Sequence, residues 1–286
     1  MSRDPDYRRR YGDWGMVVGA SEGLGEALTR NLAQRGMNLA MVARNPDKLS
    51  AAAKRVAADN NIETVAIAAD LGEPDALDRI VAGLGGREIG FFIYNCAAEN
   101  GGEFLEQDLE SHLGNIQVNC IAPTILVHYF GRKMVARGRG GIVLCSSLAG
   151  LQGVYAWTSY GASKAYEMIL GEGLWYELKH HGVDAATLVL GQTYTPNFQR
   201  SQQERDAPFA RSRDPEDLPA SVRRPQHPED AAATLFAQID REWIPHIYAN
   251  AEDKAMIKAA ANLSKTERIL QMGDAMRATY KRAVAR

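Results

Sequence analysis

The most informative segment of this 286-residue chain for its fold is Trp14-Gly15-Met16-Val17-Val18-Gly19-Ala20-Ser21-Glu22-Gly23-Leu24-Gly25. Its apolar first half predicts a buried strand, and its glycines lead into a segment with helical periodicity. Glycines at such a turn let the backbone bend sharply, let a phosphate approach without Cβ interference and let the helix pack closely on the strand. The first N–H groups of the helix also favour a bound phosphate. We therefore predict a nucleotide-binding turn at Gly19, Ser21, Gly23, Leu24 and Gly25; a tight turn without a ligand is the alternative.

Short apolar runs alternate with longer amphipathic stretches along the rest of the chain. The predicted strands are 14–18, 38–42, 64–68, 91–94, 141–145, 184–190 and 243–248, and the predicted helices are 24–35, 46–58, 74–82, 115–136, 159–180 and 228–240. This alternation is typical of βαβ units, whose right-handed crossovers place helices on both faces of a parallel sheet. We therefore predict an α/β fold with a doubly wound, seven-stranded parallel sheet of the Rossmann type.

Two segments depart from this alternation. The polar, proline-rich segment 196–227 predicts a lid loop, because connections of that length in a compact enzyme usually have a function of their own. A helical pattern returns over 251–286. We expect one domain over 1–286, with a core at about 12–250 and a C-terminal helical extension that packs on its own chain or on a partner subunit.

Composition limits the possible partners. The formal net charge of −2 shows no sign of the basic surface that nucleic acids require. No run reaches the ~20 apolar residues that span a bilayer, and the first residues lack the apolar core of a secretory signal. The chain has three cysteines, and an odd number argues against a framework of disulfides and favours free thiols in a reducing cytosol. The histidines do not have the spacing of metal ligands. We expect a cytoplasmic protein that binds a small molecule. We expect it to hold no metal and to bind neither nucleic acid nor a membrane.

The end of the second predicted strand bears on the choice of nucleotide. A carboxylate about 20 residues past the glycines usually binds a free adenine ribose, whereas a 2′-phosphate needs a cation. Here the strand ends in Ala43-Arg44-Asn45, and Arg44 offers a planar fork of donors to a phosphate. Glu22 would oppose that phosphate if it pointed inward. The sequence therefore favours NADP(H), with NAD and a solvated Arg44 left open.

The stretch Ser159-Tyr160-Gly161-Ala162-Ser163-Lys164 predicts acid/base chemistry. Tyr160 and Lys164 are four residues apart in a helix-compatible run, so both project from one face. A phenol titrates near ~10 unaided, and an ammonium ion about 5 Å away favours the phenolate by roughly 3 kcal/mol, which lowers the pKa by ~2. We predict that Tyr160 works near its pKa as an acid/base. A packing tyrosine and a solvated lysine are the alternatives.

These motifs, in this order, resemble the short-chain dehydrogenase/reductase family in its compact single-domain branch, over about 14–248. The resemblance implies that Tyr160 is the acid/base and that Lys164 lowers its pKa and holds the nicotinamide ribose. By the same match, Ser147 binds the substrate oxygen, and Asn119 steadies a water that leads protons from the lysine to solvent. Further cofactor contacts are implied at Asp70, Leu71, Asn95, Ala97, Gly191, Thr193 and Thr195.

The resemblance also implies an activity and a mode of association. We expect an NADP(H)-dependent oxidoreductase that interconverts a ketone and a secondary alcohol, and a homodimer or homotetramer formed through the predicted helices 115–136 and 159–180. A hydrophobic or cyclic substrate would suit a pocket framed by Ala98, Glu99, Leu148, Tyr155 and Tyr194. Val18, Ala98 and Leu190 depart from the family's usual threonine, glycine and proline. The alternatives are a dinucleotide-binding sensor without redox chemistry and an epimerase or dehydratase of the extended branch.

Overall fold

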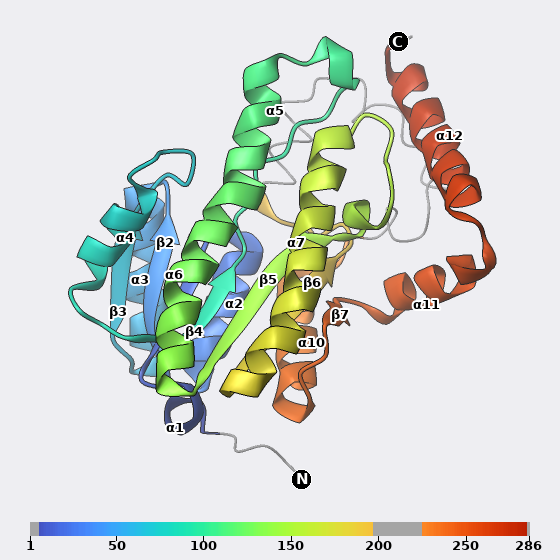
Figure 1. The fold of residues 1–286 in the computed structure, drawn as a ribbon. Coiled ribbons are helices and arrows are strands. Elements are labelled where there is room, and N and C mark those ends of the chain that lie inside the picture. Colours follow the sequence, from blue (N-terminus) through green and yellow to red (C-terminus); the bar gives the residue numbers. More distant parts are fainter. Residues whose placement is uncertain (1–5, 197–224, 285–286) are drawn as a thin grey trace.

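The structure, a computed structural model, describes residues 6–196 and 225–284, so the predicted lid at 196–227 lies almost wholly outside the described residues. Seven strands form one parallel sheet in the order β3-β2-β1-β4-β5-β6-β7 (Figure 1). The predicted doubly wound parallel sheet is confirmed. The strands are β1 (Trp14–Val18), β2 (Asn38–Ala43), β3 (Thr64–Ala68), β4 (Ile89–Tyr94), β5 (Gly140–Ser147), β6 (Val183–Leu190) and β7 (His246–Tyr248).

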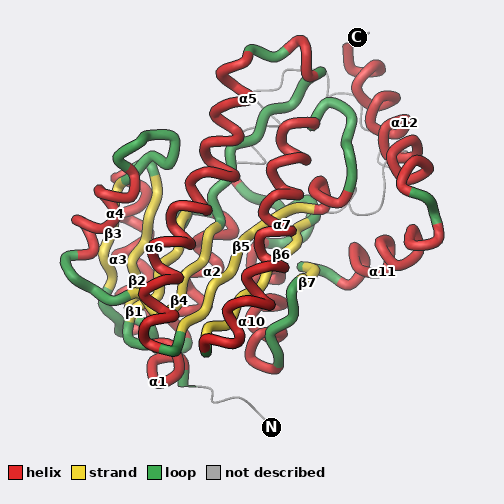
Figure 2. The backbone as a smooth tube through the Cα atoms, viewed as in Figure 1, coloured by secondary structure: helices red, strands yellow, loops and turns green. Residues whose placement is uncertain are grey.

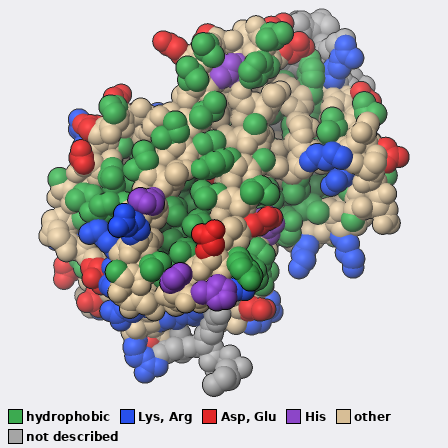
Figure 3. Space-filling model, in the orientation of Figure 1, with side chains coloured by type: hydrophobic (Ala, Val, Ile, Leu, Met, Phe, Trp, Pro, Cys, Tyr) green, Lys and Arg blue, Asp and Glu red, His purple; other side chains and the backbone are tan. Residues whose placement is uncertain are grey.

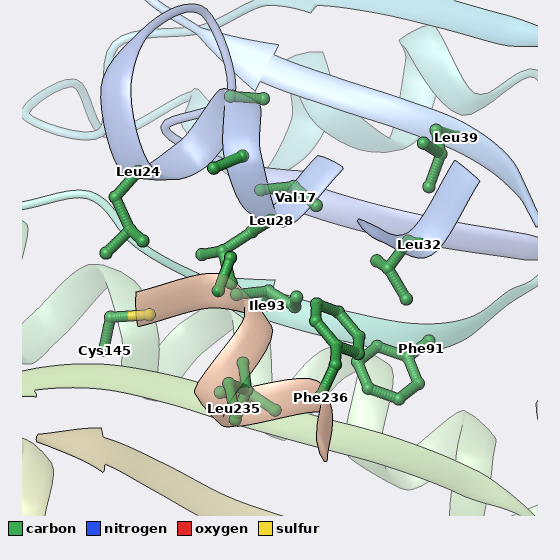
Figure 4. Close-up of a cluster of buried hydrophobic side chains, with 14 of the residues drawn as sticks. Val17, Leu24, Leu28, Leu32, Leu39, Phe91, Ile93, Cys145, Leu235 and Phe236 are labelled. Carbon is green, nitrogen blue, oxygen red and sulfur yellow. The ribbon is translucent and has the colours of Figure 1, made fainter. Parts of the chain in front are cut away.

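Helices cover both faces of this sheet (Figure 2). One face carries α2 (Gly23–Gln34), α3 (Pro46–Asn60) and α10 (Pro228–Arg241), and the other carries α4 (Ala76–Leu84), α6 (Ala122–Arg137) and α7 (Thr158–Leu178). Strand residues alternate between the two cores, since Val17 packs with the first set of helices and its neighbours Met16 and Val18 pack with the second. Figure 4 shows the first core, where Leu28 and Phe236 meet strand residues.

A short N-terminal helix, α1 (Tyr7–Tyr11), was not predicted because five residues are too few to show a period. Tyr7 and Tyr11 are 3% and 1% exposed, and the ring centroids of Tyr11 and Phe91 lie 5.0 Å apart. A Cβ at Gly90 would lie 1.7 Å from the Tyr11 carbonyl oxygen. The apolar core therefore includes residues that precede Gly12.

The predicted helix 115–136 is longer and less regular than its sequence pattern indicates. It begins at Leu109 as α5 (Leu109–Ile116), where Asp108 accepts a hydrogen bond of 2.9 Å from the Ser111 N–H. A π-helical turn, Gln117–Ile121, then leads into α6. Such turns are rare and often occur at functional sites. This one contains Asn119.

The C-terminal extension consists of α11 (Ala251–Ala259) and α12 (Lys265–Val284), which Figure 1 shows beyond the β7 edge of the sheet. The Lys265 ammonium reaches back to donate a 2.8 Å hydrogen bond to the Leu151 carbonyl oxygen. Part of the extension therefore contacts the segment that joins β5 to α7. In the described part of the chain, every helix is too short or too polar to cross a bilayer.

Candidate active site

The glycine turn lies where the strand order reverses, between the carboxyl ends of β1 and β4. Gly19 and Gly23 have φ angles of +83° and +59°, which glycine adopts without strain. A Cβ at Gly25 would lie 1.7 Å from the Gly19 carbonyl oxygen, and Asn95 Nδ2 donates a 3.2 Å hydrogen bond to that same oxygen. Three predicted cofactor residues, Gly19, Gly25 and Asn95, are therefore in contact.

The segment after β6 closes over this turn. A Cβ at Gly23 would lie 3.1 Å from the Thr195 side chain, so Thr195 packs against the glycine turn. On the opposite side of the segment, a Cβ at Gly191 would lie 2.5 Å from Asp253 Oδ2 of α11. Glycines with positive φ and the free N–H groups at the start of α2 lie together in this turn, and they fit the pyrophosphate of a dinucleotide.

The remaining predicted cofactor residues differ in what they can offer a ligand. The Leu24 and Leu71 side chains are 5% and 4% exposed and pack in the two cores, so only their backbone atoms can meet a ligand. Asp70 follows β3 and accepts a 2.9 Å hydrogen bond from the Gly72 N–H. Ser21, Ala97 and Thr193 are at least partly exposed, in the turns that follow β1, β4 and β6.

Two cations lie near the carboxyl end of β2. Arg44 directly follows the strand and is exposed. Lys48, in the first turn of α3, places its ammonium 3.0 Å from Glu22 Oε2. The Glu22 carboxylate, expected to oppose a 2′-phosphate, is therefore paired with a neighbouring lysine. Lys48 was missed in the sequence because a lysine in a first helical turn carries no motif.

Tyr160 and Ser147 converge between β5 and α7. Ser147 is the last residue of β5, Tyr160 is the third residue of α7, and the Ser147 side chain lies beside the Tyr160 phenol. The Trp157 ring meets the Tyr160 ring edge-on, with centroids 5.6 Å apart. Just before α7, Ala156 is 3% exposed and has a φ of +61°, a strained conformation for a residue with a Cβ. The strained turn and the tryptophan together fix the direction of the phenol.

Lys164 lies one turn after Tyr160 and is 2% exposed. Its Nζ is 5.9 Å from the centroid of the Tyr160 ring. The ammonium donates hydrogen bonds to the Cys145 carbonyl oxygen at 3.0 Å and to Glu167 Oε2 at 2.7 Å. Burial by itself would lower the pKa of Lys164, but the Glu167 carboxylate and Tyr160 raise it, and the pKa is raised overall. Lys164 therefore remains an ammonium ion.

The predicted lowering of the Tyr160 pKa by Lys164 is present in this structure but is outweighed, so the phenol is not unusually acidic. Burial raises the pKa of Tyr160 above the ordinary value of 10.0, and the opposing effect of Lys164 is smaller; the charge of Glu99 also raises the pKa. The spacing of Tyr160 and Lys164 in the sequence reveals the lysine charge but neither the loss of water around the phenol nor the nearby carboxylate of Glu167. Without a ligand, Tyr160 holds its proton.

Asn119 joins the β4 end to α7. Its Oδ1 accepts a hydrogen bond from the Ala98 N–H at 2.8 Å, and its Nδ2 donates to the Ala98 carbonyl oxygen at 2.8 Å and to Ser163 Oγ at 2.9 Å. The Asn119 side chain is fully buried. It therefore holds the backbone on both sides of the site in place.

A polar network that the sequence did not reveal continues from Asn119. Asn119 Nδ2 bonds Asn115 Oδ1 at 3.0 Å, and Asn115 Nδ2 bonds Asn100 Oδ1 at 2.9 Å. Asn100 and Ser159 both reach His112 Nδ1, at 3.1 and 2.7 Å. The network ends beside Tyr160 and supports the first turn of α7. His112, Asn115 and Asn119 have helical spacing, but no sequence pattern connects them to Asn100 or Ser159, which lie in other segments.

Comparison with known proteins identifies the family. The family model of the short chain dehydrogenases matches residues 14–206. A 7beta-hydroxysteroid dehydrogenase of Collinsella aerofaciens is 32% identical over 191 residues, which cover 67% of this chain and 73% of that protein. A 7beta-hydroxysteroid dehydrogenase of Clostridium sardiniense is 29% identical over 238 residues, which cover 83% of this chain and 86% of that protein.

Solved structures agree with this match. A structure from work on 7beta-hydroxysteroid dehydrogenase stereoselectivity has a TM-score of 0.81 and 27% identity and covers 93% of this chain and 99% of its own. A short-chain dehydrogenase of Sphingobium yanoikuyae in complex with NADPH has the same fold, with a TM-score of 0.72 and 24% identity over 88% of this chain and 96% of its own. This chain thus belongs to the short chain dehydrogenase family, whose enzymes are NAD(P)-dependent oxidoreductases that interconvert ketones and secondary alcohols.

Proposed function

We propose that this protein reduces a hydrophobic or cyclic ketone with NADPH, and oxidises the alcohol in the reverse direction, with Tyr160 as the acid/base. The observation that carries the proposal is the convergence of three side chains: the Lys164 ammonium lies 5.9 Å from the centroid of the Tyr160 ring, and the Ser147 side chain lies beside the phenol. All three residues lie by the carboxyl ends of the strands, at the same sheet edge as the glycine turn.

In this mechanism Ser147 and Tyr160 act on the substrate oxygen, and Lys164 binds the cofactor ribose. In reduction, Ser147 donates a hydrogen bond to the carbonyl oxygen, and the Tyr160 phenol gives that oxygen its proton. The nicotinamide, when bound, supplies the hydride. Burial keeps Tyr160 protonated at neutral pH, which suits a proton donor. Lys164 has three N–H donors and uses two of them within the protein, so one is left for the ribose hydroxyls.

The preference for NADPH is supported by Arg44 and by the pairing of Glu22 with Lys48. We expect Arg44→Ser to lower the ratio of kcat/KM with NADPH to kcat/KM with NADH by at least about tenfold, since a charged hydrogen bond contributes ~1.5–3 kcal/mol. Steady-state kinetics with both cofactors measure this ratio. Lys54→Ser removes one exposed positive charge elsewhere on α3 and is the matched control. An equal ratio in Arg44→Ser and wild type would reject Arg44 as the phosphate ligand.

A steroid-like ketone is the first substrate class to test, because the relatives from Collinsella aerofaciens and Clostridium sardiniense are named 7beta-hydroxysteroid dehydrogenases. The experiment follows the loss of NADPH absorbance with steroid, bulky aromatic and β-keto acyl ketones in parallel. Turnover of any of these ketones supports the reductase, and the best substrate defines the class. NADPH binding without turnover of any ketone would instead favour a dinucleotide sensor.

We also propose that the protein self-associates through α5, α6 and α7. Figure 3 shows hydrophobic side chains gathered over these helices. On α5 and α7 they repeat at intervals of three, four and seven residues, so both helices turn an apolar stripe outward, and Ile121 and Ile125 continue it through the π-helical turn into α6. The exposed members are Leu109, Leu113, Ile116, Ile121, Ile125, Tyr166, Ile169 and Tyr176. An outward stripe on adjacent helices is expected where two copies meet.

We expect Ile169→Glu to dissociate the oligomer, because Ile169 is 65% exposed in the described chain and a buried charge at the interface would have no partner. Analytical ultracentrifugation of wild type and variant over a range of concentrations measures this effect. Ala51→Glu adds the same charge on α3, on the opposite face of the sheet, and should leave the mass unchanged. A monomeric wild type, or an oligomeric Ile169→Glu, contradicts the proposed interface.

A further inference from the structure

A buried carboxylate lies directly behind the Lys164 ammonium. Glu167 is fully buried on α7, and its Oε2 is 2.7 Å from Lys164 Nζ. Its other oxygen, Oε1, is also buried and has no hydrogen-bond partner among the described residues. One turn later, a Cβ at Gly171 would lie 1.9 Å from Thr187 Oγ1, so α7 packs closely on β6 beside the carboxylate. The carboxylate is thus sealed in the protein with a single ionic partner.

We propose that Glu167 is a positioning residue for the Tyr160–Lys164 pair: it directs the Lys164 ammonium and offsets part of its charge, and so sets the pH range in which Tyr160 exchanges its proton. The inference deepens the proposed function and rests on it for its kinetic consequences. Its effect on the Tyr160 phenol does not depend on turnover. Glu167 does not touch the reacting atoms and acts through Lys164.

Stability alone does not account for this ion pair. Burying two charges costs about as much free energy as their attraction returns, and apolar replacements of buried pairs are often neutral or stabilising. A carboxylate with a purely structural role is also expected to have hydrogen bonds on both oxygens. Glu167 has them on one. Burial raises the pKa of Glu167 to about 7, against the opposing effect of Lys164. Keeping the buried carboxylate ionised therefore costs free energy.

The other titratable groups around Glu167 remain neutral at ordinary pH. Burial raises the pKa of Tyr94 on β4 well above 10.0, that of Cys96 to about 11, and those of Cys120 in the π-helical turn and Cys145 on β5 above 9.0. The charge that acts on Glu167 is therefore that of Lys164. In turn, Glu167 raises the pKa of both Lys164 and Tyr160.

The sign of the effect follows from the charges. With Glu167 ionised, the loss of the Tyr160 proton takes the group of three side chains from neutral to a net charge of −1. With glutamine at this position, the same step takes the group from +1 to neutral, which is easier. Removal of the carboxylate charge is therefore expected to lower the apparent pKa of the Tyr160–Lys164 pair by ~1.

The direct test is a pH titration of the Tyr160 phenol by 13C NMR, in protein labelled at tyrosine Cζ and free of cofactor. Tyr160→Phe assigns the signal. We expect the midpoint in Glu167→Gln to lie ~1 pH unit below that of the wild type, and the midpoint in Glu167→Asp, which keeps the charge at a longer distance, to lie between them. Glu177→Gln removes an exposed carboxylate from the same helix and should leave the midpoint unchanged.

The kinetic test measures alcohol oxidation against pH, because oxidation requires the phenolate. The rise in kcat should begin ~1 pH unit lower in Glu167→Gln than in wild type and Glu177→Gln, and Glu167→Asp should restore most of the difference. A Tyr160 signal that titrates no earlier in Glu167→Gln than in the wild type overturns the inference, whatever the thermal stability of the variant. If Glu167→Gln does not fold, Glu167→Asp provides the same comparison with a smaller shift. Absence of turnover in the wild type, with the expected NMR shift, would reject the proposed function and leave the role of Glu167 standing.

Discussion

Tyr160→Phe should lower the turnover of ketone by about a thousandfold while the Kd for NADPH changes by less than about twofold. A positioned proton donor contributes ~10²–10⁴ in rate, and phenylalanine keeps the ring but has no proton to give. The ring contact with Trp157, at 5.6 Å between centroids, remains available to phenylalanine, so α7 should keep its place. The measurements are kcat with the best ketone of the panel and a fluorescence titration with NADPH.

Tyr176→Phe is the matched control for this prediction. Tyr176 lies on the same helix, is 59% exposed and is far along α7 from the carboxyl ends of the strands. Its substitution should leave kcat within about twofold of the wild type, because phenylalanine keeps the apolar ring at the proposed subunit interface and the lost hydroxyl is far from Tyr160 and the glycine turn. Equal turnover in Tyr160→Phe and Tyr176→Phe would remove Tyr160 from the mechanism.

Gly25→Ala should weaken NADPH binding by about a hundredfold and lower the free energy of unfolding by ~3 kcal/mol. The new Cβ would lie 1.7 Å from the Gly19 carbonyl oxygen and 2.9 Å from Asn95 Nδ2, and a backbone atom cannot move aside as a flexible side chain can. The start of α2 must therefore shift away from the loop, and its N–H donors shift with it. Fluorescence titration with NADPH and urea denaturation measure the two effects.

Gly114→Ala separates this clash from the general effect of an added methyl group. Gly114 lies inside α5, and a Cβ there would meet nothing within 4 Å. Alanine in an open helical position should stabilise the protein by up to ~1 kcal/mol and leave NADPH binding unchanged. If Gly25→Ala binds NADPH as tightly as Gly114→Ala, the glycine turn is not the pyrophosphate site.

The elements that form the sheet were predictable because their signals are local. The runs 14–18 and 64–68 agree with β1 and β3 at both ends, since each is a short apolar run that stops at a turn. The predicted strand 243–248 begins too early, because Trp243 is 4% exposed and packs in the core, where its Nε1 donates a 3.2 Å hydrogen bond to the Tyr11 hydroxyl. Apolar side chains bury themselves equally well in strands and in irregular segments, so hydrophobicity alone could not place that boundary.

The candidate chemical groups could be predicted from the sequence, because the glycine turn and the pairing of Tyr160 with Lys164 depend on spacing along one turn or one helix. The electrostatic state of these groups could not, because it depends on the packing of the folded chain. The direction of the Tyr160 pKa, the neutralisation of Glu22 by Lys48 and the enclosure of Glu167 all depend on the distance between side chains and on the exclusion of water. Those quantities arise when segments far apart in the chain pack together, and a linear pattern contains neither of them.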